Sequence, residues 1–230
     1  MNILAIETSC ERASVALLCG TRMCERALEG HANHSEYLLP TLRGLLAEAQ
    51  MSLTRLDAVA FGCGPGAFTG LRLACGVAQG LAMGAGLGVV PVSSLAALSL
   101  QADAEHVFVA TDARMGEVYS AAYRVVDGVP VIAREMRCDP PELVSFPPDG
   151  QWSVIGSALR AHAAILVPRW AERAAAWNDH AVPRASDVAR IAATEIGAGR
   201  VLAPEQAAPV YVRDKVALTT RERLARGGRA

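Results

Sequence analysis

Hydrophobic and polar positions in the first fifty residues follow strand spacing first and helix spacing afterwards. Leu38, Leu42 and Leu45 repeat at intervals of four and three residues, which predicts an amphipathic helix over residues 35 to 49. Before this helix, short apolar runs separated by polar turns predict a three-stranded meander. Its strands are expected at Asn2 to Ile6, Ala13 to Cys19 and Met23 to Leu28.

A strand-to-helix unit with a glycine-rich turn follows. The apolar stretch Ala58 to Phe61 predicts a strand, and a helix is expected from Thr69 to about Met83. Between them runs Gly-Cys-Gly-Pro-Gly-Ala-Phe-Thr-Gly-Leu-Arg, residues 62 to 72. A further strand and a short helix complete the region, at Gly88 to Val92 and from the capping pair Ser93-Ser94 to about Ala102.

The same order of elements restarts near His106 in a less regular form. The expected elements are strands at Val107 to Thr111, Glu117 to Val126 and Val129 to Arg137, a turn at Asp112 to Gly116, a hairpin at Asp127-Gly128, a short helix near Pro141 to Ser145, a strand at Trp152 to Ile155 and helices to about Gly197. This repeat predicts an α/β protein with two stacked halves, each a mixed sheet flanked by helices. We place the halves at residues 1–103 and 104–230.

Composition limits the classes of protein that this chain can represent. With 230 residues, 52% of them hydrophobic, the chain can bury a sizeable core. No apolar run is long enough for a membrane span, and the chain starts with a strand instead of a leader, so a cytoplasmic protein is expected. The net charge of −1 gives no general attraction to nucleic acid, although the tail after Tyr211 is basic. Six cysteines without Cys-x-x-Cys spacing are expected to be reduced thiols.

The glycine-rich run permits close approach of the backbone to a ligand or to another segment. It contains four glycines and one proline, and Thr69 is positioned to cap the following helix. Helix amides behind such a loop can bind an anion or a carbonyl group, and a sharp turn alone remains an equal alternative. The run lacks the Gly-Lys-Ser/Thr ending of a phosphate-binding Walker loop.

Five segments spread over most of the chain form a specific set: Ile3 to Ser9, His34 to Pro40, Gly64 to Arg72, Asp112 to Tyr119 and Pro209 to Arg213. In this order they resemble the bacterial TsaB (YeaZ) family of the actin-like ATPase superfamily, which is built from two duplicated ribonuclease-H-like halves. The resemblance implies a role in placing a threonylcarbamoyl group on N6 of adenosine 37 in tRNAs that read codons beginning with A. In that family the paralogue TsaD catalyses the transfer, TsaB is its partner, and the ATPase TsaE is a third component.

The resemblance also implies candidate nucleotide ligands at the turn that ends the first strand of each half. These are Glu7, Thr8, Ser9, Asp112 and Arg114. Glu7 departs from the aspartate usual in the family, and a longer side chain fits the tight geometry of Mg²⁺ poorly. Turn carboxylates more often accept local N–H groups, so we expect at most weak ATP or ADP binding and no required cofactor.

No arrangement of residues predicts a catalytic or metal centre. His31 and His34 lie three residues apart, whereas the paralogue resembles a helix with two histidines four apart. No nucleophile elbow or Cys/His signature appears. We therefore expect no catalytic residue and no metal ligand, and the alternatives are a stand-alone actin-like ATPase or kinase and a glycoprotease-like peptidase.

An apolar interface is expected on the helix of residues 35 to 49 and on the glycine run with its helix, where many side chains are small. It can serve the TsaD paralogue or a second copy of the chain, which would give a homodimer. The alternative is that these side chains fill the protein's own core. The candidates are Tyr37, Leu38, Leu39, Leu42, Leu46, Gly64, Pro65, Gly66, Phe68, Thr69, Arg72, Leu73 and Val77.

Together these observations predict a non-catalytic partner and activator of the transferase. TsaD is the expected direct partner, TsaE belongs to the same complex, and tRNA is reached through that complex. Basic residues after Tyr211 are an additional candidate for contact with tRNA phosphates, against the alternative of a solvated tail.

Overall fold

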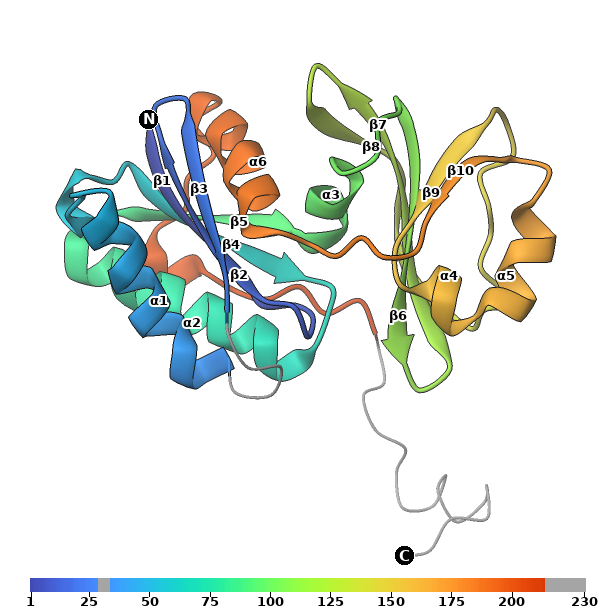
Figure 1. The fold of residues 1–230 in the computed structure, drawn as a ribbon, viewed down its shortest axis with the longest axis horizontal. Helices are drawn as coiled ribbons and strands as arrows, with labels where there is room; N and C mark the ends of the chain where they lie inside the picture. The colour runs from blue at the N-terminus through green and yellow to red at the C-terminus, as the bar shows by residue number, and fades with distance from the viewer. Residues whose placement is uncertain (29–33, 214–230) are drawn as a thin grey trace, which may run out of the picture.

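The computed structural model describes residues 1–28 and 34–213. Two lobes, each built around a five-stranded mixed sheet, lie side by side (Figure 1). This confirms the predicted α/β fold with two halves. Within the described residues, no helix is long and apolar enough to cross a membrane.

The first lobe contains a sheet in the order β3-β2-β1-β4-β5. Its first three strands form the predicted antiparallel meander, whereas β4 and β5 run parallel to β1. The strands are β1 Asn2–Glu7, β2 Ser14–Cys19, β3 Arg22–Ala27, β4 Ala58–Gly64 and β5 Gly88–Ser93. The helices along this part of the chain are α1 His34–Glu48, η1 Leu53–Arg55, α2 Phe68–Ala85 and α3 Ser94–Ser99.

The second lobe repeats this topology in the order β10-β9-β6-β7-β8. The meander comes first in the sequence, and β9 and β10 then add parallel to β6. The strands are β6 His106–Arg114, β7 Glu117–Val126, β8 Val129–Asp139, β9 Trp152–Ile155 and β10 Ala174–Asn178. The remaining helices are α4 Ala158–Ala161, α5 Ala163–Trp170, α6 Ala185–Gly197 and η2 Pro204–Gln206.

Alternation along the strands divides the core into layers. Leu4 and Ile6 of β1 face α1 and α2, in a cluster with Leu38 and Phe61. The intervening residues of β1 face α6, and small side chains at this surface allow the helix to lie close to the sheet. A separate aromatic cluster fills the outer layer of the second lobe under α4 and α5, where the Phe108 ring lies edge-on to Trp170.

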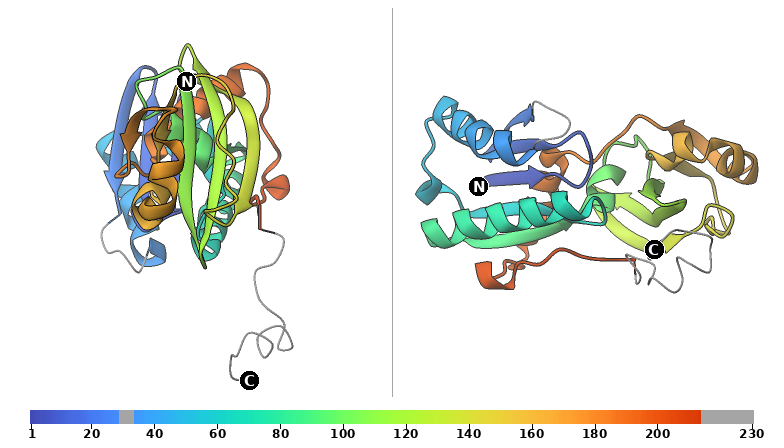
Figure 2. Two further views of the ribbon diagram at one scale, coloured as in Figure 1. Left: turned by 90° about the vertical axis from the view of Figure 1, so that its right-hand side faces the viewer. Right: turned by 90° about the horizontal axis from the view of Figure 1, so that it is seen from below.

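The chain beyond Pro183 returns to the first lobe. Helix α6 packs against the first sheet, and the orange-red end of the described chain lies along the first lobe (Figure 2). An antiparallel bridge joins Val89 to Leu202. From there the chain runs along β4, where the N–H of Val210 donates to the carbonyl of Cys63 at 2.7 Å. Residues of the second half of the sequence therefore complete the first lobe.

Four local predictions are corrected by the structure. Residues 141 to 145 form a turn, with Leu143 and Val144 both donating to the carbonyl of Pro140, and not a helix. Strand β10 is an exposed edge strand where helix was expected. It was not predicted because its alanine-rich sequence lacks the alternating apolar face that indicates a strand. Helix α2 begins at Phe68 behind Ala67 with no side-chain cap, so Thr69 does not cap it. Strand β6 continues to Arg114, which shortens the expected turn. By contrast, the predicted Ser93 cap is confirmed, since its hydroxyl accepts from the N–H of Ala96.

Candidate functional site

The last residue of β1 carries a carboxylate that is sealed from solvent. Glu7 is fully buried, and its Oε1 accepts from the N–H of Ser9 at 2.7 Å. Its Oε2 accepts from the hydroxyl of Ser94 at 2.8 Å. A Cβ atom on Gly62 would lie 2.0 Å from the same oxygen, so β4 passes directly against the carboxylate. Burial raises the pKa of Glu7, and the hydrogen bonds from Ser9 and Ser94 lower it in part.

The glycine run packs onto the turn after β1. The N–H of Ala67 donates to the carbonyl of Ser9 at 2.7 Å, and the Thr8 hydroxyl donates to the carbonyl of Gly70 at 2.7 Å. A Cβ atom on Gly70 would lie only 1.9 Å from the Thr8 carbonyl oxygen, a distance that no side chain tolerates. The run therefore achieves its close backbone approach against the protein's own chain.

Two of the three nucleotide-ligand candidates on the first turn are already engaged within the protein. The oxygens of Glu7 point toward Ser94 and Gly62, the Thr8 hydroxyl is already engaged, and neither residue lines the cavity between the lobes. Ser9 borders the cavity and is the one residue of this trio that does so.

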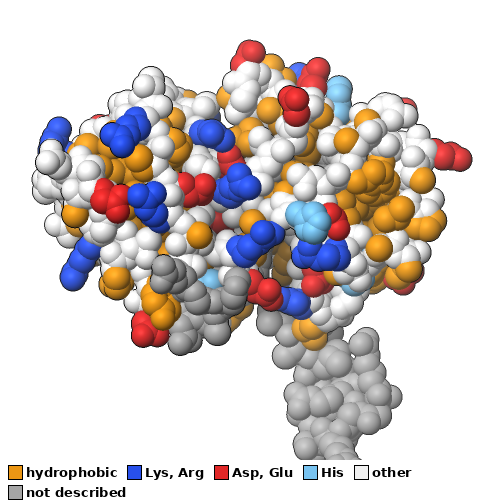
Figure 3. Space-filling model, viewed as in Figure 1, with side chains coloured by type: hydrophobic (Ala, Val, Ile, Leu, Met, Phe, Trp, Pro, Cys, Tyr) orange, Lys and Arg blue, Asp and Glu red, His pale blue; other side chains and the backbone are white. Residues whose placement is uncertain are grey.

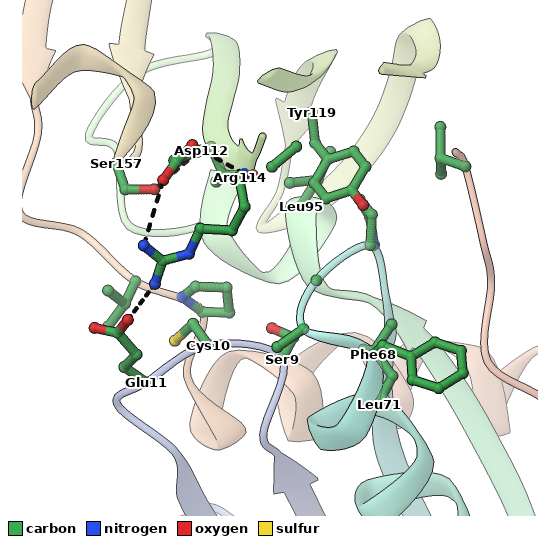
Figure 4. Close-up of a pocket in the computed structure, with 18 of the residues that line it drawn as sticks. Ser9, Cys10, Glu11, Phe68, Leu71, Leu95, Asp112, Arg114, Tyr119 and Ser157 are labelled. Carbon is green, nitrogen blue, oxygen red and sulfur yellow. Dashed lines mark hydrogen bonds and ion pairs between the residues drawn. The ribbon is translucent and has the colours of Figure 1, made fainter. Parts of the chain in front are cut away.

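The corresponding turn of the second half is open. Asp112 borders the cavity; its Oδ1 accepts from the N–H of Arg114 at 3.0 Å, and its own N–H donates to the Ser157 hydroxyl at 3.0 Å. The guanidinium of Arg114 extends across the gap between the lobes and pairs with Glu11 (Figure 4). The His162 Nε2 atom lies 3.5 Å from the Asp112 carboxylate.

A cavity of about 530 Å³ lies between the two lobes. Figure 4 shows Ser9 and Cys10 on one side and Asp112, Arg114 and Ser157 on the other. Apolar side chains such as Leu95 and Tyr119 cover its inner wall. The structure thus brings Ser9, Asp112 and Arg114 of the candidate set together, and it leaves Glu7 and Thr8 outside.

A C-terminal strap, residues 209–213, joins the lobes beside this cavity. Its Arg213 donates to the carbonyl oxygens of Ala113 at 2.8 Å and Arg114 at 3.2 Å, and it forms an ion pair with Glu117 at 2.6 Å. Only 14% of the Arg213 side chain is exposed. Pro209 to Arg213 is one of the segments by which the sequence resembles the family. The sequence alone does not indicate that Arg213 binds the backbone of the Asp112 turn.

An aromatic group lies where the strap passes α2. The guanidinium carbon of Arg72 is 3.9 Å from the centre of the Phe68 ring, and its Nε donates to the Tyr211 hydroxyl at 3.0 Å. The rings of Phe68 and Tyr211 are 5.6 Å apart and both are half exposed. Their contact was not foreseen, because the two residues are far apart in the sequence.

The candidate interface residues divide between surface and core. Exposed positions are Tyr37, Leu39, Phe68, Thr69 and Arg72, and partly buried ones are Leu46, Gly66, Leu73 and Val77. Leu38, Leu42, Gly64 and Pro65 are buried inside the protein itself. Leu39 is 46% exposed beside the buried Leu38, so α1 has an apolar face directed outward as well as one directed inward.

The remaining expectations concern metal ligands, thiols and the tail. Among the described residues, no group of three or more His, Cys, Asp and Glu side chains is arranged to hold a metal ion. All six cysteines are free, and burial raises the pKa of Cys63 to about 12. His31 and the basic tail beyond residue 213 lie outside the described residues.

Comparison with known proteins places the chain in a family. A family model described as tRNA N6-adenosine threonylcarbamoyltransferase, TsaD, matches residues 29–221. The tRNA threonylcarbamoyladenosine biosynthesis protein TsaB of Escherichia coli is 36% identical, and the match covers 94% of this chain and 96% of that protein. The TsaB protein of Haemophilus influenzae is 32% identical, with 94% and 95% covered.

Solved structures agree with this placement. YeaZ from Pseudomonas aeruginosa is 38% identical, with a TM-score of 0.81 over 91% of this chain and 99% of that one. A second Pseudomonas aeruginosa structure, described as an uncharacterized protein with similarity to peptidase YEAZ, gives a TM-score of 0.83 at 38% identity and covers 92% and 99%. With its duplicated lobes and these relatives, the chain belongs to the TsaB (YeaZ) family of the actin-like ATPase superfamily.

Proposed function

We propose that this chain acts in tRNA threonylcarbamoyladenosine biosynthesis as a non-catalytic partner and activator of a TsaD-type transferase. The modified position would be N6 of adenosine 37 in tRNAs that read codons beginning with A. The names of the TsaB relatives support the pathway, and the match to the TsaD family model is consistent with a partner of the same fold.

The sealed Glu7 turn carries the non-catalytic part of the proposal. An actin-like enzyme needs a carboxylate and a phosphate loop that are free to meet a nucleotide, yet here Ser94 and the glycine run occupy those groups. This argues against a stand-alone ATPase or kinase. A peptidase is not favoured either, because the sequence contains no nucleophile elbow and no Cys/His signature.

The outward face of α1 and the start of α2 support docking of the partner. Tyr37, Leu39 and Phe68 are 37%, 46% and 46% exposed, and apolar side chains of this size favour protein contacts. On this proposal TsaD binds here, TsaE joins the complex, and a second copy of the chain occupies the same surface when TsaD is absent. On this proposal the chain requires no cofactor and binds ATP or ADP at most weakly. The complex acts in the cytoplasm.

Reconstitution tests the proposal directly. Threonylcarbamoyl transfer to tRNA should require both this chain and its TsaD partner, and the chain alone should neither modify tRNA nor hydrolyse ATP. Turnover by the pure chain at ordinary enzyme rates, about 1 to 1,000 per second, would contradict the proposal. Full transfer by TsaD and TsaE without this chain would contradict the activator role.

A further inference from the structure

Arginines gather along the line where the two lobes meet. Figure 3 shows this face, with blue side chains crossing from one lobe to the other. Arg12 and Arg184 border an open depression of about 790 Å³ between the lobes, and the guanidinium of Arg160 lies 3.3 Å from the ring of His180 on its rim. We call Arg12, Arg160 and Arg184 the seam arginines; all three are exposed.

The seam arginines form no salt bridges among the described residues, although burial raises the pKa of Asp187 and the charge of Arg184 lowers it in part. Within residues 1–28 and 34–213, none of the three has an acidic oxygen at salt-bridge distance. Arg12 donates to the carbonyl of His180, and Arg160 donates to the carbonyl of Asp179 at 3.4 Å. These neutral acceptors hold two of the guanidinium groups in place and leave further N–H donors for another ligand. By contrast, Arg190 pairs with Asp187 at 2.7 Å.

The acidic groups nearby define what kind of anion fits. Glu25 and Asp187 both border the depression, but Glu25 accepts from Ser14 and Ser186, and Asp187 accepts from Gln101 as well as pairing with Arg190. A small anion deep in the depression would face both carboxylates. An extended polyanion that lies across the seam would meet the exposed guanidinium groups first.

We infer that the seam arginines contact the phosphate backbone of the tRNA substrate, an inference that rests on the proposed function. They come from three segments: the turn before β2, helix α4 of the second lobe, and the residue before α6. Arg12 and Arg160 both donate to the segment 179–180, so the three groups form one exposed cationic surface at the seam. Guanidinium groups suit phosphate because they donate in a planar fork. The bound RNA would span both lobes.

The test uses a triple variant, Arg12→Gln, Arg160→Gln and Arg184→Gln, and a control triple with the same change in charge. The control replaces Arg22, Arg55 and Arg124, which are exposed, lie on β3, η1 and β7, and do not border the depression; of these, Arg124 pairs with Glu105 at 3.8 Å. Each variant is assembled with its TsaD partner, and binding of unmodified tRNA is measured by fluorescence anisotropy between about 50 and 200 mM salt.

The seam variant is expected to raise the Kd for tRNA at least tenfold at the lowest salt. The slope of log affinity against log salt concentration should become less negative by about 2 to 3. Each lost phosphate contact should change this slope by slightly less than one. The control should change Kd less than twofold. Replacing the same three residues by lysine keeps the charge and should restore most of the salt dependence.

Equal affinity of the seam variant and the wild type would overturn the inference, and so would loss of TsaD binding in place of tRNA binding. Should the triple variant melt much lower, Arg184→Gln alone gives the answer, because Arg184 forms no ion pair among the described residues; its Kd should rise about threefold. A wild-type complex that fails to modify tRNA would reject the proposed function. Modification by the seam variant with an unchanged KM for tRNA would reject only the seam contact.

Discussion

The two halves of this protein share one topology but use the end of the first strand differently. In each sheet the first strand pairs in parallel with a neighbouring strand, and the last residue pair is followed by a glycine on that neighbour. In the first sheet this pair is Ile6 with Phe61, before Gly62. In the second sheet it is Val109 with Ile155, before Gly156. Aligned on these pairs, Glu7 corresponds to Ala110. Asp112 falls two residues further along, on an extension of β6 that passes a register shift.

This offset explains why one carboxylate is sealed and the other is open. Glu7 lies at the end of β1, where β4 and α3 cover its carboxylate. Asp112 is still paired with Val118 of β7, but it lies beyond the last pair between β6 and β9 and borders the cavity. The glycine that follows the last parallel pair shows the same difference between the two halves. A Cβ on Gly62 would strike the Glu7 carboxylate, and one on Gly156 would strike the Ala110 carbonyl oxygen at 2.3 Å. A carboxylate after the first strand therefore does not define equivalent sites in a duplicated fold.

The largest expected effect comes from breaking the packing that seals the first half. Gly70→Ala places a methyl group 1.9 Å from the Thr8 carbonyl oxygen, and both backbones are fixed by neighbouring hydrogen bonds. We expect a loss of at least about 3 kcal/mol in the free energy of unfolding, measured by urea denaturation.

Gly76→Ala is the matched control for that change. It lies in the same helix, and no atom is within 4 Å of the added methyl group. Because alanine favours the helix, this variant should gain about 0.5 to 1 kcal/mol. Equal stabilities of the two variants would show that α2 does not press on the first turn.

The second expected effect concerns the strap that fastens the open turn. Arg213→Met removes the ion pair with Glu117 and leaves the Ala113 and Arg114 carbonyls without their donor. Since Glu117 is 33% exposed and can regain water, the cost should be about 2 kcal/mol and not the full value of a buried pair. Thermal melting measures it.

Arg114→Met provides the comparison for the strap, because its side chain is 70% exposed and pairs with an equally exposed Glu11. Its cost should stay below about 0.5 kcal/mol. If Arg213→Met were equally mild, the strap would not contribute to holding the lobes together.

The third prediction separates the surfaces of the two halves. Leu39→Asp puts a charge on the exposed face of α1, and it should weaken binding to the TsaD partner more than tenfold, about 1.4 kcal/mol or more. Ile132 is 52% exposed on the edge strand β8, so Ile132→Asp is the control and should leave binding unchanged. Isothermal calorimetry with the partner compares them, and melting curves should match the wild type for both. Unchanged binding by Leu39→Asp would place the interface elsewhere.

Most of the fold was predictable because its signals are local. Apolar runs bounded by turn residues located β1 to β9, and the leucine spacing located α1, since strand and helix periods are written directly in the sequence. The exposed β10 gave no such signal. Its alanines satisfy helix propensity, and pairing with β9 determines its structure instead.

The site was less predictable because it depends on contacts between distant segments. Glu7 and Asp112 were both expected in the turn after a first strand, and only the parallel register reveals that they are two residues out of step. Similarly, Arg72 meets Tyr211 and Arg213 meets Glu117 because the chain returns to the first lobe after Pro183. No single-sequence pattern encodes that return.

The final prediction tests whether the first turn is truly sealed, through its response to pH. Glu7→Gln keeps the shape, its carbonyl can still accept from Ser9, and its amide can donate to the Ser94 hydroxyl. Burial raises the pKa of Glu7 above the usual 4.5, so the folded state holds the proton more tightly than the unfolded chain. Below that value both states are protonated and there is no penalty. As the pH rises through the folded pKa, the wild type loses stability that the glutamine variant does not lose. The Tm of Glu7→Gln minus that of the wild type should therefore increase from about pH 4 upward and level off above the folded pKa. A constant difference across this range would mean that water reaches the carboxylate and that the turn is open like that of Asp112.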